Sequence, residues 1–168
     1  MILIVGHGPS CMKSLERPED YEYVIRMKEQ AGPQGKTTHY IYRKSGNQSP
    51  IEGLINWEVN ELRASWSDWW KSKEKMSVGL AAICGAVEHL RAKSVTLVGF
   101  DSHITNVGNR YGKGTGAAHN WRAERIAAND LVEVFYGRHT MSDEMTESAL
   151  QARLDRIFIR FPAAAGVK

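Results

Sequence analysis

The sequence contains little cysteine and no long apolar run, and each shortage excludes a class of protein. Its two cysteines, Cys11 and Cys84, stand far apart and neither belongs to a paired motif. This argues against a disulfide framework or a cysteine-based zinc site and favours a reducing compartment such as the cytoplasm. The apolar run from Ile2 to Val5 is far shorter than the roughly 18 residues that cross a bilayer, and no basic segment precedes it. We therefore expect neither a membrane span nor a signal peptide.

Charge of one sign is also scarce, because 22 Lys and Arg residues face 19 Asp and Glu residues and leave a net charge of +3. An excess this small does not by itself indicate a nucleic-acid partner, since nucleic-acid-binding domains concentrate basic residues on one face. Hydrophobic residues make up 42% of the chain and charged residues 24%, which excludes a disordered tail. With 168 residues and no internal repeat, the sequence predicts one domain over residues 1–168.

Strand-like and helix-like segments alternate along the chain. The run at residues 2–5 is apolar throughout and stops at a glycine, which is typical of a strand buried on both faces of a parallel sheet. Further strands are expected at 21–27, 38–43, 94–100 and 157–161, and helices at 11–16, 54–71, 77–90, 119–135 and 142–153. The inward face of the 119–135 helix is expected to carry Ala123, Ala127, Leu131 and Val134. The alternation predicts an α/β fold, a Rossmann-like three-layer α/β/α sandwich with a mainly parallel sheet.

A glycine-containing loop follows the first predicted strand and precedes a helix. It consists of Gly6, His7, Gly8, Pro9 and Ser10. Backbone N–H groups and the positive end of a helix dipole can bind phosphate oxygens at such a place. The loop has neither the spacing of dinucleotide-binding folds nor the lysine of a P-loop, which argues against an NAD enzyme and an NTPase. Nucleotide-phosphate binding and a plain tight turn are the two interpretations.

Two further polar residues stand where the ends of elements are expected. Asp101 ends another strand, and a parallel sheet would place it on the same edge as the glycine loop. It could bind a sugar hydroxyl, orient a base, ligate a metal with His103, or cap the next loop; no third ligand is evident, so no metal is expected. His119 begins a predicted helix after a glycine-rich stretch. It could serve as a general base or be a surface or capping residue.

Aromatic and basic residues are each gathered in one part of the chain. The first group is Trp57, Trp66, Trp69 and Trp70, and the second is Arg110, Lys113, Arg122 and Arg125. The tryptophans could stack on a sugar or a base, although bulky residues at helical spacing more often form a core or an interface through which the chain would form a homo-oligomer. The basic residues could favour an anionic donor or simply be solvated.

Several of these motifs follow one another in an order that resembles a known family. The motifs are 4–10, 24–27, the Ser77-Val78-Gly79 helix start, 97–101 and His119. They are similar to landmarks of the bacterial sialyltransferases of glycosyltransferase family 42. Those enzymes have a strand followed by G-N-G-P-S, an F-R-x-N segment, a Ser-Gly pair opening a helix, a strand ending in G-I-D, and a His before the next helix.

The resemblance implies transfer of a sugar from a nucleotide-activated, possibly CMP-linked, donor to a glycan or other hydroxyl acceptor, without a metal or other cofactor. The glycine loop, Ser77, Gly79 and Asp101 would line the donor site. His119 would be the general base, and Tyr111 and His103 would stabilise the departing phosphate. Arg26 and Lys28 correspond to the donor-binding F-R-x-N segment. His7 and Lys28 replace two asparagines of the family.

Other functions stay open on the sequence alone. The chain could be a non-catalytic protein that binds a nucleotide or nucleotide-sugar and has abandoned turnover. It could also be a phage-type transferase that modifies a nucleic-acid base, for which the basic stretch from Arg110 to Arg125 is the support. A structural protein that assembles through its tryptophan-bearing face is a further alternative.

Overall fold

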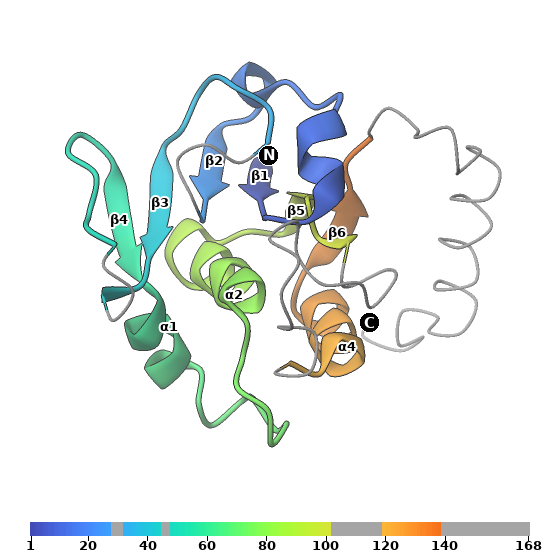
Figure 1. Ribbon diagram of the computed structural model, residues 1–168. Coiled ribbons are helices and arrows are strands. Elements are labelled where there is room, and N and C mark those ends of the chain that lie inside the picture. The colour runs from blue at the N-terminus through green and yellow to red at the C-terminus, as the bar shows by residue number, and fades with distance from the viewer. Residues whose placement is uncertain (28–31, 45–47, 102–118, 139–168) are drawn as a thin grey trace, which may run out of the picture.

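One sheet of parallel strands organises the chain (Figure 1). The computed structural model describes residues 1–27, 32–44, 48–101 and 119–138. Within them the strands are β1 (Ile2–Val5), β2 (Tyr23–Arg26), β3 (His39–Tyr42), β4 (Ile55–Glu58), β5 (Ser94–Val98) and β6 (Glu133–Tyr136). Their order across the sheet is β4-β3-β2-β1-β5-β6, and every pairing is parallel. The predicted Rossmann-like α/β fold with a parallel sheet is confirmed.

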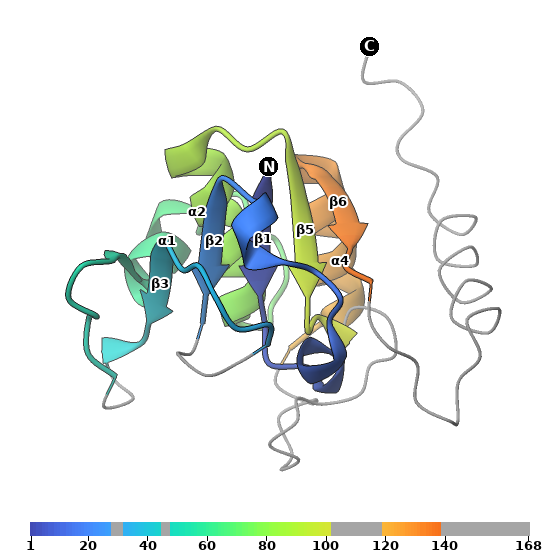
Figure 2. The same cartoon turned by 90° about the horizontal axis from the view of Figure 1, so that it is seen from above.

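The helices cover the two faces of the sheet unequally. In the described residues, α1 (Val59–Ser65), α2 (Val78–Leu90) and α4 (Trp121–Leu131) lie on one face, and the short 3-10 helices η1 (Pro9–Lys13) and η2 (Pro18–Asp20) lie on the other (Figure 2). The connection from β1 leads to β2 on one side of the sheet, and the connection from β5 leads to β6 on the opposite side. Since both connections are expected to be right-handed, they must run over opposite faces of the sheet. This is where η1 and α4 lie.

The alternation of side chains along β1 divides its apolar run between two cores. Ile2 and Ile4 belong to the larger cluster on the side of α1, α2 and α4. Leu3 and Val5 belong to a smaller cluster that includes Cys11 of η1. All four side chains of the strand are at most 5% exposed, and burying an aliphatic side chain of this size contributes about 1.5–3 kcal/mol. This explains why a strand in the middle of the sheet is apolar at every position.

The predicted helix at 54–71 is wrong at both ends, because α1 covers only Val59–Ser65 of it. Residues Ile55–Glu58 instead form β4, which pairs with β3 and buries Trp57. The Glu58 carboxylate then accepts hydrogen bonds from the backbone N–H groups of Asn60 and Glu61, which caps the start of α1. Helical spacing of bulky residues concealed this boundary, because a strand and a helix follow each other here with no turn residue between them.

Two other expected helices have different bounds in the structure, and two expected elements lie outside the described residues. The helix expected at 119–135 ends at Leu131, because the residues after it form β6 and pair with β5. In place of the helix expected at 11–16, the chain forms the 3-10 helix η1. It begins two residues earlier, at Pro9, and ends three residues earlier, at Lys13. The helix and strand expected at 142–153 and 157–161 lie outside the described residues. In the part of the chain that is described, no helix has the length and apolar character needed to span a membrane.

Candidate functional site

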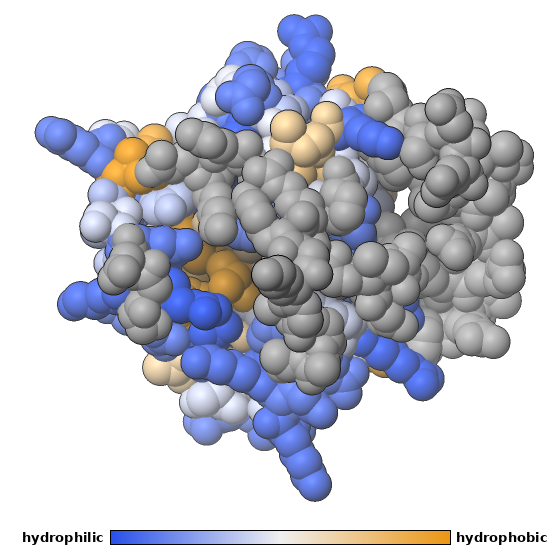
Figure 3. Space-filling model, viewed as in Figure 1, coloured by the Kyte–Doolittle hydropathy of each residue, from blue (hydrophilic) through white to orange (hydrophobic). Residues whose placement is uncertain are grey.

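The order of the strands creates a switch point between β1 and β5. From β1 the chain adds β2, β3 and β4 on one side, and from β5 it adds β6 on the other. Ligands of open parallel sheets bind outside the carboxyl ends of the strands at such a point. Figure 3 shows the molecule in the same view as Figure 1, with apolar surface among hydrophilic side chains. The elements that meet at this edge of the sheet therefore form the candidate site.

The glycine loop and the end of β5 are bound to each other at the switch point. The N–H of Gly6 donates to the carbonyl oxygen of Val98, and the N–H of Gly8 donates to that of Gly99, both at 2.7 Å. Ser10 donates its hydroxyl to Asp101 Oδ2 at 2.8 Å and its N–H to Oδ1 at 3.2 Å. The prediction that Asp101 lies on the same edge as the glycine loop is confirmed.

These bonds determine which groups of the loop are available to a ligand. The N–H groups of Gly6, Gly8 and Ser10 already donate to acceptors within the protein. The Asp101 carboxylate lies beside the start of η1, which is the place where the sequence suggested that a phosphate could bind. A phosphate placed against these groups would have to compete with that carboxylate and would be repelled by its charge. Asp101 thus binds Ser10 across the switch point. The loop after Asp101, which it was expected to cap, lies outside the described residues.

Phe100 connects the glycine loop with the start of α2. A Cβ added to Gly6 would lie 3.1 Å from the Phe100 ring, and one added to Gly79 would lie 2.7 Å from it. The Cβ on Gly6 would also lie 2.7 Å from the Gly99 carbonyl oxygen, so neither position has room for a side chain. Gly79 thus allows Phe100 to pack closely against the start of α2.

Ser77 caps α2 and is held by a buried carboxylate from α4. Its hydroxyl accepts the N–H of Leu80 at 3.1 Å and donates to Glu124 Oε2 at 2.5 Å. Its N–H donates to Glu124 Oε1 at 2.7 Å. Both residues are buried, and Glu124 is fully inaccessible at 0% exposure. Since the Ser77 hydroxyl makes both of these bonds, its role in the structure is to join α2 to α4.

Glu124 is the residue at this edge that the sequence reasoning missed. The inward face of α4 consists of Glu124 and Ala128, whereas Ala123, predicted to face inward, is only partly buried. Ala127 and Leu131 pack at the margin of the core. The spacing of four between Glu124 and Ala128 could have indicated this face, but a charged residue is not an expected core position.

His119 lies just before α4, which begins two residues later and is capped by Asn120. Its Nδ1 is 2.7 Å from the carbonyl oxygen of Lys75 and 3.9 Å from Glu124 Oε1. A carbonyl oxygen can only accept, so Nδ1 carries the hydrogen, and in the neutral ring Nε2 is the acceptor. The side chain is 18% exposed. The expected helix start at His119 is wrong by two residues, but its place before the helix is confirmed.

The N-termini of α2 and α4 lie at the same edge as the glycine loop for a topological reason. Each of these helices leads back to the beginning of a parallel strand, so each must start where the carboxyl ends of the strands lie. The segment before α2 is also held by three residues from other parts of the chain. Arg63 of α1 donates from Nε to the Met76 carbonyl oxygen at 2.8 Å, His119 binds Lys75, and Glu124 binds Ser77.

Arg26 holds a neighbouring loop. Its guanidinium donates from Nε to Thr37 Oγ1 at 2.7 Å and from Nη2 to the Pro33 carbonyl oxygen at 2.6 Å. The residue is 3% exposed, and burial lowers the pKa of the guanidinium. These bonds attach the turn before β3 to the end of β2. The donor-binding role expected for Arg26 stays a prediction, and Lys28, His103 and Tyr111 lie outside the described residues.

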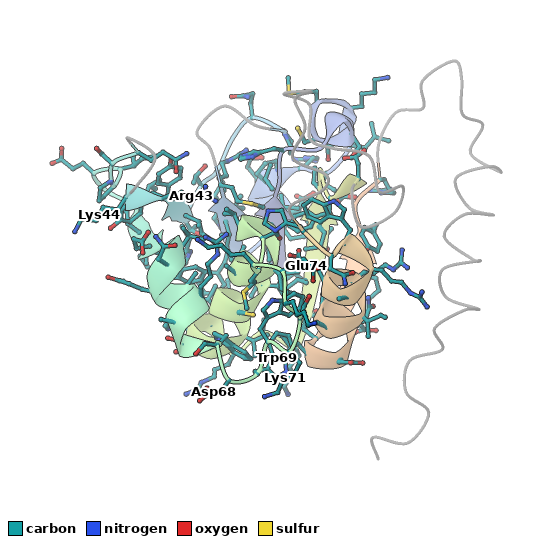
Figure 4. The ribbon with its side chains drawn as sticks, turned by 60° about the horizontal axis from the view of Figure 1, so that its bottom comes forward. Arg43, Lys44, Asp68, Trp69, Lys71 and Glu74 are labelled. Atoms are coloured by element: carbon teal, nitrogen blue, oxygen red, sulfur yellow. The ribbon has the colours of Figure 1, made fainter. Side chains whose placement is uncertain are left out.

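The tryptophans lie away from the glycine loop. Trp57 is buried in the larger core, and Trp66, Trp69 and Trp70 pack against it at partial burial. In Figure 4, Trp69 and Lys71 lie at the bottom of the view, on the segment between α1 and α2 and apart from Arg43 after β3. This geometry agrees with a packing role for these side chains.

Metal ligands are not gathered in the described ranges, where no group of three or more His, Cys, Asp and Glu side chains could hold an ion. Comparison with known proteins gave no match to a family model, a curated protein or a solved structure.

Proposed function

We propose that the protein transfers a sugar from a nucleotide-activated donor to an acceptor hydroxyl, with His119 as the general base. The observation that carries this proposal is the bond from His119 Nδ1–H to the Lys75 carbonyl oxygen. It directs the chemistry to Nε2, on a ring that stands at the ligand-binding edge of the sheet. The resemblance of the motif order to the sialyltransferases supports the same assignment.

In the proposed reaction, Nε2 of His119 takes the proton of the acceptor hydroxyl as its oxygen attacks the anomeric carbon of the donor. The new C–O bond forms while the bond from that carbon to the phosphate oxygen breaks, and the electron pair leaves with the nucleotide. Attack from the opposite side inverts the anomeric centre. The imidazolium then returns its proton to water. A positioned base of this kind contributes roughly 10²–10⁴ in rate.

The donor is assigned to the region outside the carboxyl ends of β1 and β5. Because the N–H groups of Gly6, Gly8 and Ser10 are engaged within the protein, the proposal assigns the phosphate to side chains. By resemblance these are Tyr111 and His103. The carboxylate of Asp101 favours hydroxyl groups of the donor as its neighbours, since a hydroxyl can donate to it and a phosphate would be repelled.

Thermal shift measurements with CMP-, UDP- and GDP-sugars at millimolar concentration test the donor site. A ligand at 100 times its Kd stabilises the folded state by about 2.7 kcal/mol, which raises Tm by roughly 5–11 °C in a chain of this size. We expect one nucleotide class to produce such a shift. The absence of a shift with all three would overturn the donor site.

Mass spectrometry of the transfer product, with His119→Ala and His89→Ala compared with the unchanged chain, tests the base. His89 is an exposed histidine near the end of α2, at the opposite edge of the sheet, and serves as the matched control. Loss of product with His119→Ala alone supports the proposal. Donor binding without a product in the unchanged chain would instead favour the non-catalytic binding protein.

A further inference from the structure

Glu124 has surroundings that packing alone does not require. A carboxylate taken out of water costs several kcal/mol unless it is paired and hydrogen-bonded. Here it accepts two hydrogen bonds from Ser77 and lies at the N-terminus of α2, where the helix dipole favours a negative charge. An apolar residue in the same space would leave the buried N–H and hydroxyl of Ser77 without this acceptor. The charge of the carboxylate also lies beside His119.

The charge is placed beside the ring that the proposed reaction makes cationic. Oε1 of Glu124 lies 3.9 Å from Nδ1 of His119, and the same oxygen accepts the Ser77 N–H. The carboxylate thus acts on the ring in two ways. It attracts the positive charge directly, and it fixes the segment whose Lys75 carbonyl accepts the Nδ1 hydrogen.

We propose that Glu124 is the positioning residue of His119, because its buried carboxylate holds the ring in the Nδ1–H tautomer and stabilises the imidazolium formed when Nε2 takes the acceptor proton. The catalytic consequence rests on the proposed function, but the tautomer does not. No bond to the carboxylate forms or breaks in this role, and its proton count stays the same throughout.

Among the described residues, two further titratable groups interact with the carboxylate, one from α1 and one from α2. Arg63 of α1 is attracted to Glu124, and Cys84 of α2 is a buried thiol whose pKa is raised to about 12, chiefly by burial and further by Glu124 and Glu88. The thiol therefore stays neutral across the working pH range. Arg63 is cationic in both states of His119, so the imidazole is the one of these described groups whose charge changes beside the carboxylate.

The test replaces Glu124 with Gln and reads the imidazole directly. Side-chain ¹H–¹⁵N spectra of His119 across pH 5–9 report which nitrogen carries the hydrogen, without any substrate. We expect the Nδ1–H tautomer in the unchanged chain, and in Glu124→Gln a titration midpoint displaced to lower pH. With a donor identified, we expect kcat to fall about 10- to 100-fold, as charges about 4 Å apart allow, and the acid limb of the rate profile to move to lower pH.

Two control variants separate this role from a purely structural one. Ser77→Ala removes the hydroxyl bonds to Glu124 and to the Leu80 N–H but keeps the carboxylate and the backbone bond to it, so it should lower Tm without moving the acid limb. Glu88→Gln removes a carboxylate of α2 that binds Trp66 Nε1, and it should leave the His119 titration unchanged.

Each result decides the proposal. An Nε2–H tautomer in the unchanged chain overturns it even if Glu124→Gln does not fold. An identical His119 titration in folded Glu124→Gln overturns it as well. If the tautomer and titration behave as expected but no donor is ever turned over, the positioning by Glu124 stands and the proposed function fails.

Discussion

Replacing Gly8 with Ala should destabilise the protein through steric clashes with Asp101 and Gly99 at the switch point. A Cβ on Gly8 would lie 1.9 Å from Asp101 Oδ2 and 2.6 Å from the Gly99 carbonyl oxygen, and Cβ atoms essentially never show contacts under 3.0 Å. The backbone of Gly8 is in an extended conformation with φ −61°, so the penalty is one of space and not of dihedral angle.

The magnitude follows from the bonds that the Asp101 carboxylate must give up when it retreats. Ser10 donates to it from both its hydroxyl and its N–H, and a hydrogen bond to a charged group contributes about 1.5–3 kcal/mol. Because the site is only partly buried, we expect a total loss of about 3 kcal/mol, which lowers Tm by roughly 6–12 °C in a chain of this length. Urea denaturation monitored by circular dichroism measures the loss.

Gly53→Ala is the matched control for this substitution. Gly53 has φ +81° and no atom within 4 Å of an added Cβ, so alanine there costs conformational energy alone, about 1–2 kcal/mol. The reasoning is refuted if Gly8→Ala costs no more than Gly53→Ala. It also requires coupling, since Gly8→Ala should cost less in an Asp101→Ala background than in the unchanged chain.

The remaining predictions concern groups whose pKa is displaced. Burial lowers the pKa of His39, so the unfolded chain takes up a proton below about pH 6.5 that the folded chain does not. The free energy of unfolding should therefore fall from pH 7 to pH 5. In urea titrations, His39→Phe should make this pH dependence weaker. Burial raises the pKa of Cys84 to about 12, so mass spectrometry should find it alkylated by iodoacetamide only after denaturation. Burial raises the pKa of Glu16, but hydrogen bonds from Tyr21 and the Arg138 N–H outweigh burial and lower the pKa overall. Glu16→Gln should therefore lower the free energy of unfolding by about 1 kcal/mol at pH 7, and by less at acid pH, where the native carboxyl is protonated. An equal loss at pH 3 would contradict this prediction.

The parts of the fold that followed from the sequence are those with an uninterrupted local signal. The apolar run of β1 and the capped, small-residue helix α2 are each specified by adjacent residues, and so is the place of Asp101 once the sheet is parallel. The boundary within 54–71 was not predictable in this way, because Trp57 is placed by pairing with β3 and not by its neighbours in the chain.

The site shows the same division. The loop from Gly6 to Ser10 and the position of His119 before a helix could be predicted from local pattern. The Lys75 carbonyl that fixes the His119 ring is 44 residues away in sequence, and the Ser77 partner of Glu124 is 47 residues away. Contacts over such separations arise from the packing of α1, α2 and α4, which no local spacing encodes.

A crystal structure with the nucleotide that gives the largest thermal shift tests the central claim most directly. The account predicts the nucleotide outside the carboxyl ends of β1 and β5, with the Ser10–Asp101 bonds intact and Nε2 of His119 facing the side from which an acceptor would attack. A nucleotide bound elsewhere on the chain, or a His119 ring whose Nε2 is turned away from it, would contradict the account.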